Sequence, residues 1–188
     1  MEASRIAVRD LTMIALFVAI IAVMAQITIP VQPVAFTMQT FAVFVTGLVL
    51  GAKRGAIAAA LYLMLGALGA PVFSAFQGGF GMLIGTHGGY LWSFPLVAFI
   101  IGFAADRVFR QEDASKLKYL WLTLALIFAS FVNLSLGTLY LAQVLQIGIP
   151  AAALSGMVPF LIPEALKIAL AIAIAPKIRH IIESRNFT

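Results

Sequence analysis

The sequence predicts an all-α integral membrane protein with six transmembrane helices and an N- and a C-terminus that are both cytoplasmic. Three observations predict this class. The chain is 63% hydrophobic and only 10% charged, whereas soluble proteins carry roughly a quarter charged residues. The apolar residues form six runs separated by connections that contain charges, proline or many glycines, and the basic residues lie in alternate connections. At about 20 residues per span, six spans leave room in 188 residues for little else. We therefore treat residues 1–188 as a single transmembrane domain.

Each apolar run is expected to be a helix, because a segment in lipid must satisfy its own backbone hydrogen bonds. The first run stops before Pro30 and the sixth before Pro176, since proline cannot continue the hydrogen-bond ladder. The fifth is long, so we expect it to tilt or to extend beyond the hydrocarbon. In chain order, the predicted spans are Leu11–Ile29, Phe36–Ala52, Gly55–Val72, Tyr90–Ala105, Tyr119–Leu145 and Val158–Ala175.

Basic residues predict the orientation of these spans. The first, third and fifth connections (about residues 30–35, 73–89 and 146–157) contain no Lys or Arg. By the positive-inside rule, both termini and the other connections then face the cytoplasm. The eleven basic residues that set this orientation are Arg5, Arg9, Lys53, Arg54, Arg107, Arg110, Lys116, Lys118, Lys177, Arg179 and Arg185.

The net charge of +5 does not indicate a nucleic-acid partner, because the basic residues lie at the ends of apolar runs rather than on a soluble surface. The absence of cysteine excludes a catalytic thiol and a thiolate metal site. His87 and His180 are too few for a metal centre, and the chain has no phosphate-loop motif. We therefore expect no metal, no cofactor and no catalytic residues in this chain. Residues 1–25 resemble a signal peptide in part, but their apolar run continues to Ile29.

The third connection, FSAFQGGFGMLIGTHGG (residues 73–89), is rich in glycine and carries no charge. Its apolar residues argue against a simply solvated loop. Two interpretations remain open for it. One is a lid over an outward-facing pocket, and the other is an interfacial re-entrant turn without a role in binding.

Glu164 and Lys167 are the two charges that orientation does not explain. They lie three positions apart, which places them on one helical face in the outer half of the sixth span. Each alone would cost about 2.5–3.5 kcal/mol at the centre of a membrane helix. They either neutralise one another as a structural pair or bind a ligand.

Uncharged polar side chains at similar depth favour the ligand. We expect an outward-facing polar pocket that contains Gln39, Tyr90, Asn133, Tyr140 and Gln143 beside Glu164 and Lys167. A purely structural role is also open for each of these residues taken singly. Tyr90 is typical of an interfacial anchor, and Asn133 of a hydrogen bond between helices. Ala15 and Ala19 form a small-x-x-x-small face on the first span, which permits close helix packing.

Several segments together resemble BioY, the biotin-specific S component of energy-coupling-factor (ECF) vitamin transporters. The resemblance covers about residues 10–175 and rests on PVAFTMQTFAVFVTGLVL (33–50), GAKRG (51–55), LYLMLGALGAPVF (61–73) and GTHGGYL (85–91). The family's P-G-D-x-x-K pattern aligns with Ile162-Pro163-Glu164-Ala165-Leu166-Lys167, so the charges keep their spacing, Glu replaces Asp and the glycine is absent. Thr86 and His87 also stand where the family usually has Pro-Thr or Pro-Ser.

The resemblance implies a six-helix S-component fold in a multi-pass protein of the bacterial cell membrane. It implies that biotin is captured in an outward-facing pocket by Gln39, Tyr90, Asn133, Glu164 and Lys167. It also implies docking, through Ala15 and Ala19, on a transmembrane coupling subunit that two cytoplasmic ATPases drive by hydrolysing ATP. A self-sufficient secondary transporter of a small organic anion is the alternative, although we find no convincing internal repeat.

Overall fold

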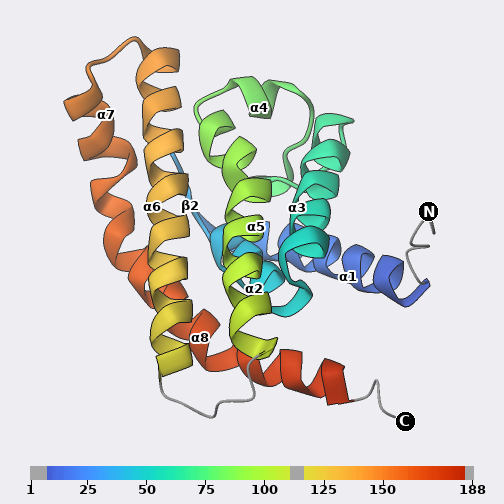
Figure 1. The fold of residues 1–188 in the computed structure, drawn as a ribbon. Helices are drawn as coiled ribbons and strands as arrows, with labels where there is room; N and C mark the ends of the chain where they lie inside the picture. Colours follow the sequence, from blue (N-terminus) through green and yellow to red (C-terminus); the bar gives the residue numbers. More distant parts are fainter. Residues whose placement is uncertain (1–7, 111–116, 185–188) are drawn as a thin grey trace, which may run out of the picture.

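The computed structural model describes residues 8–110 and 117–184, and Figure 1 shows the short helix α2 behind α5, in the lower middle of the helices. Two strands, β1 (Thr28–Ile29) and β2 (Phe36–Thr37), pair antiparallel. Single 3-10 turns lie at Ser74–Phe76 and Val158–Phe160. The helices are α1 (Val8–Ala25), α2 (Gln39–Leu50), α3 (Ala52–Ala67), α4 (Gly81–Ile84), α5 (Gly88–Arg110), α6 (Leu117–Leu145), α7 (Ile149–Gly156) and α8 (Leu161–Ser184).

Four segments of the described chain are long and apolar enough to cross a membrane: α1, α5, α6 and the stretch Ile149–Ile182 that holds α7 and α8. The prediction of a helical, multi-pass membrane protein is therefore confirmed. The helices α2, with 12 residues, and α3, with 16, are shorter than the ~20 residues of a full span. Three of the residues used for orientation, Arg5, Lys116 and Arg185, lie outside the described residues.

The first two predicted spans are too long in the sequence-based assignment. Helix α1 ends at Ala25 instead of Ile29, because Gln26 donates to the carbonyl oxygens of Ala22 (3.0 Å) and Phe73 (3.1 Å) and turns the chain. The apolar residues after it extend into β1. Phe36 likewise belongs to β2, and α2 begins at Gln39. Ile27, Ile29 and Phe36 are as apolar as the neighbouring helix residues, so hydropathy alone does not mark where the helix ends and the strand begins.

The next helix also starts earlier than predicted. Lys53 and Arg54 lie in the first turn of α3 instead of in a connection, and Gly51 alone joins α2 to α3. Gly51 has φ of 79°, a left-handed conformation that glycine adopts without strain. A Cβ on this residue would also overlap the carboxylate of Asp106. Glycine is therefore required at this junction.

The last helix extends well past its predicted end. Helix α8 continues through Pro176 to Ser184, beyond the predicted stop at Ala175. Proline is tolerated within membrane helices because neighbouring groups satisfy the freed backbone. Here Ala175 and Arg179 are both buried on either side of it, so packing holds the helix together. Helix α5 is longer than predicted as well, and α7 occupies most of the predicted fifth connection.

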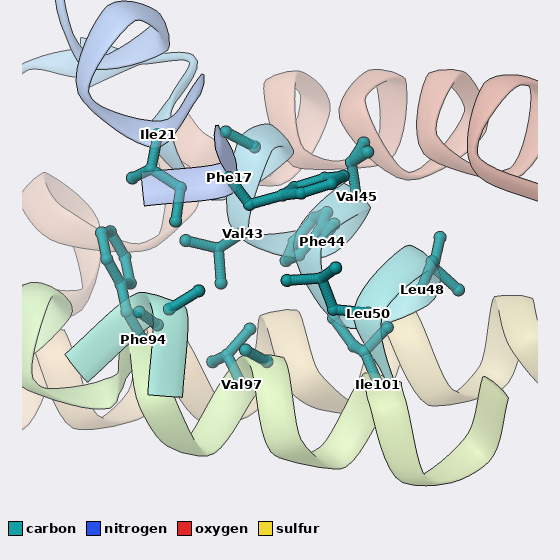
Figure 2. Packing of buried hydrophobic residues seen from close by; sticks show 14 of the residues in the cluster. Phe17, Ile21, Val43, Phe44, Val45, Leu48, Leu50, Phe94, Val97 and Ile101 are labelled. Carbon is teal, nitrogen blue, oxygen red and sulfur yellow. The ribbon is translucent and has the colours of Figure 1, made fainter. Parts of the chain in front are cut away.

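Helix α2 forms the centre of the apolar core. It packs against α1, α3, α5 and α8, which explains its nearly continuous apolar sequence. Figure 2 shows Phe17 and Ile21 of α1 and Val97 and Ile101 of α5 pointing toward side chains of α2. This core fixes the start of α2 relative to α5, α6 and α8, where the polar residues meet.

Candidate ligand-binding pocket

A small cavity of about 40 Å³ lies where α2, α5, α6 and α8 converge. Its lining includes all five residues predicted to bind a ligand: Gln39, Tyr90, Asn133, Glu164 and Lys167. These residues come from four helices that are far apart in the sequence. The structure brings them together, and their role in binding stays a prediction.

The polar end of the pocket is a buried ion pair. Lys167 Nζ lies 2.7 Å from Glu164 Oε1, and the two side chains are only 8% and 4% exposed. Both residues belong to the first two turns of α8. The Thr40 hydroxyl joins the pair, since it donates to Glu164 Oε1 at 2.7 Å and accepts from Lys167 Nζ at 2.8 Å. Ser130 donates to Glu164 Oε2 at 3.1 Å.

These contacts determine what the polar end offers to a ligand. Glu164 already accepts from Thr40, Ser130 and Lys167, and an ionised carboxylate has further lone pairs for a ligand N–H. The ammonium group of Lys167 has three donors, of which Thr40 and Glu164 take two. One charged donor of Lys167 is therefore left for a ligand oxygen.

Asn133 holds two helices together and also faces the pocket. Its amide nitrogen donates to the Tyr90 carbonyl (3.1 Å) and to Ser93 Oγ (2.6 Å), which links α6 to α5. The interhelical hydrogen bond considered from the sequence is therefore present. The amide oxygen is the Asn133 group that is suited to accept from a ligand.

Tyr90 is a fixed wall of the pocket and not an interfacial anchor. It is 8% exposed, and its hydroxyl donates to the Gly156 carbonyl at 2.7 Å. Its ring packs against Gly137, where a Cβ would overlap the ring. The Tyr90 ring also stacks on Phe160 with centroids 6.3 Å apart, and Phe160 contacts Phe36 at 4.4 Å. The pocket therefore combines a charged end with an aromatic wall.

Gln39 is held from both sides. Its amide nitrogen donates to the Tyr62 hydroxyl, and its amide oxygen accepts from Thr37 Oγ1 at 3.0 Å. Tyr62 in turn donates to the Val72 carbonyl at 3.0 Å. The start of α2 is thereby tied to α3 and to the chain that follows it.

The glycine-rich connection forms part of the pocket wall, through Phe73, Ser74, Met82 and His87. His87 Nε2 accepts from the backbone N–H of Ala35 at 3.4 Å, so this connection meets the segment before α2. Burial lowers the pKa of His87, which lies just before α5, and the neutral ring keeps Nε2 available as an acceptor. Small-ligand pockets usually measure about 300 Å³ or more, so the cavity in this conformation is smaller than a typical ligand site.

Two residues expected in the pocket lie elsewhere. Gln143 is exposed near the end of α6. Tyr140 lines a separate hollow and packs against Gly88 and Gly89. Tyr140 lies two helical turns beyond Asn133, about 10 Å along α6, which carries it past the pocket.

The sequence reasoning missed Thr40 and Ser130. Ser130 lies three residues before Asn133 and therefore on the same face of α6, so helical periodicity was the available signal. Ala15 and Ala19 are both exposed on α1, away from the pocket. Among the described residues, no group of three His, Asp or Glu side chains is arranged to hold a metal ion.

Several known proteins are similar to this chain in sequence. A family model described as the BioY family matches residues 1–184. A biotin transporter BioY of Thermotoga maritima is 37% identical over 173 residues, covering 92% of this chain and 97% of the relative. A probable biotin transporter BioY of Pyrococcus horikoshii is 36% identical over 171 residues, covering 91% and 96%.

A solved structure, described as the S-component for biotin from an ECF-type ABC transporter, has the same fold. The TM-score is 0.83 at 24% identity, and the superposition covers 96% of this chain and 95% of the other. This match confirms the S-component fold predicted from the sequence resemblance, whereas the count of six spans and the orientation of the termini stay predictions.

Proposed function

The chain belongs to the BioY family, and from that membership we propose that it is the substrate-binding membrane subunit of a biotin uptake transporter. The observation that carries the proposal is the buried Glu164–Lys167 pair with Thr40, at the end of a pocket with aromatic walls. The relatives named above as biotin transporters support biotin as the ligand.

The pocket suits both chemical parts of biotin. Glu164 accepts from the ureido N–H groups, and the remaining donor of Lys167 binds either the ureido oxygen or the valerate carboxylate. The aromatic wall of Tyr90 and Phe160 contacts the fused rings, and Gln39 and Asn133 complete the lining. Binding of biotin methyl ester, in which the carboxylate is blocked, distinguishes these two alternatives for Lys167. The ester should bind more weakly than biotin only if Lys167 binds the valerate carboxylate.

We further propose six spans, with both termini in the cytoplasm and the pocket facing outward. Under this assignment, α2 and α3 are the second and third spans despite their length, because α2 is buried on nearly all sides and needs no contact with lipid over its whole length. The alternation of basic residues supports this orientation. The proposed location is the bacterial cell membrane.

Active uptake requires an energy source that this sequence does not contain in recognisable form. We propose an ECF coupling subunit that docks on α1 at Ala15 and Ala19, with two ATPases that hydrolyse ATP. Support comes from the S-component fold and from the exposure of both alanines on α1. Small residues permit the close helix approach that such docking needs.

Uptake of labelled biotin in cells separates this function from the alternative, a self-sufficient secondary transporter of a small organic anion. The chain is expressed with and without a coupling subunit and its ATPases, in a host that lacks its own biotin uptake. We expect ATP-dependent uptake only with the module. Equal uptake without it, abolished when the ion gradient is collapsed, would favour the secondary transporter.

A further inference from the structure

A second concave surface lies at the other end of α5 from the pocket. It is a groove of about 830 Å³ between the N-terminal parts of α1 and α3 and the C-terminal parts of α5 and α8. Tyr90 and Arg110 lie near opposite ends of α5, roughly 30 Å apart along the helix. The apolar end of the groove is closer to the pocket, since Phe99 follows the pocket residue Phe94 by five positions, about 8 Å along α5. The groove and the pocket share no lining residue.

The groove is strongly basic after its internal ion pairs are counted. Both of its carboxylates among the described residues are already engaged, Asp10 with Arg54 at 2.6 Å and Asp106 with Arg179 at 3.0 Å. Asp106 also accepts from the backbone N–H of Ala52 at 2.9 Å. Three basic residues of the groove, Lys53, Arg107 and Arg110, have no acidic partner among the described residues. Glu112 and Asp113, which follow Arg110 in the sequence, lie outside the described residues.

An apolar strip leads away from these charges along α5. The rings of Phe99 and Phe103 are stacked with centroids 6.2 Å apart, and they are 44% and 46% exposed. The guanidinium of Arg107 lies 4.1 Å above the Phe103 ring. Since Phe99 is closer to the middle of α5, the strip runs from the basic end toward the membrane interior. The groove therefore offers a basic surface for an anionic group and, next to it, an apolar surface for a hydrocarbon chain.

We propose that this groove binds an anionic phospholipid. Its phosphate lies among Lys53, Arg107 and Arg110, and an acyl chain follows Phe103 and Phe99. Basic pockets between membrane helices at the cytoplasmic side bind anionic head groups in this way. The Asp106–Arg179 pair forms the floor, because Arg179 is only 8% exposed and also donates to the Leu48 carbonyl at 3.1 Å. The floor thus ties α2, α5 and α8 together and holds the groove open.

Binding of phosphatidylglycerol and phosphatidylcholine to the purified full chain in detergent tests the proposal, with native mass spectrometry as the readout. The variant is Lys53→Gln/Arg110→Gln, which removes two exposed charges. The control, Lys118→Gln/Lys177→Gln, removes two charges outside the groove. We expect preferential, saturable binding of phosphatidylglycerol that the variant weakens roughly 30-fold and the control leaves unchanged.

Three results would overturn the proposal. Equal binding of phosphatidylcholine, or equal weakening in the control, would show general membrane attraction without a site. Competition by inorganic phosphate as strong as that by phosphatidylglycerol would show a free-anion site. Unchanged phosphatidylglycerol binding, together with loss of a co-purified acidic protein partner in the groove variant, would show a protein contact instead.

Discussion

Replacing Lys167 by Met separates the two interpretations of the buried ion pair. Met has similar length but no donors, so Glu164 keeps Thr40 and Ser130 and loses its cation. Because both charged side chains are at most 8% exposed, removing one should lower the free energy of unfolding by about 3–5 kcal/mol. Loss of a charge-assisted hydrogen bond to biotin should weaken binding by about 1.5–3 kcal/mol, which is roughly 10- to 150-fold.

The double variant Glu164→Gln/Lys167→Met removes the unpaired charge and completes the test. We expect it to recover most of the lost thermal stability, because the Gln amide oxygen still accepts from Thr40 and Ser130. Biotin binding should stay at least tenfold weaker, since no charged donor faces the ligand. Lys177→Met, an exposed lysine of the same helix, is the control. Biotin binding by the double variant at wild-type strength would refute the assignment of Lys167 to the ligand.

Three further changes test the surroundings of the pair. Thr40→Val removes the hydroxyl that bridges the two charges and should weaken biotin binding about tenfold or more in equilibrium dialysis, whereas Thr46→Val, whose hydroxyl bonds only its own helix, should not. Gly137→Ala places a methyl group against the pocket's tyrosine ring and should reduce both thermal stability and binding, whereas Gly81→Ala meets no atom within 4 Å. Because the pKa of His87 is lowered in the folded chain, the unfolded chain binds a proton on this residue more readily, and thermal stability should fall as the pH drops below about 6.5. His87→Gln should flatten this pH dependence. A pH profile of thermal stability that the substitution leaves unchanged would contradict the contribution of His87.

The sequence was most informative where a residue conflicts with its surroundings. Glu164 and Lys167 are charges within an apolar run, and hydropathy and the positive-inside rule leave them unexplained. That conflict located the polar end of the pocket. Thr40 and Ser130 present no such conflict, because hydroxyl side chains are common in membrane helices and usually bond their own backbone. Their role depends on the packing of α2 and α6 against α8.

Helix boundaries were predicted less well than helix existence, for a related reason. Pro176 breaks the hydrogen-bond ladder locally, but burial of Arg179 one turn later continues α8. Near the N-terminus, Ile27 and Ile29 continue the apolar run of α1, yet Thr28 and Ile29 pair with the strand before α2. In both places tertiary contacts decide the backbone, and a single sequence does not display those contacts. Tyr140 was misplaced because depth along a helix was judged from residue type alone.

Equilibrium binding of labelled biotin to the purified chain, without any partner, tests the central claim most directly. The account predicts saturable binding of one biotin per chain, displaced by unlabelled biotin and not by thiamine. Lys167→Met should abolish most of this signal while Lys177→Met retains it. Absence of saturable biotin binding in correctly folded protein, or equal displacement by thiamine, would contradict the account.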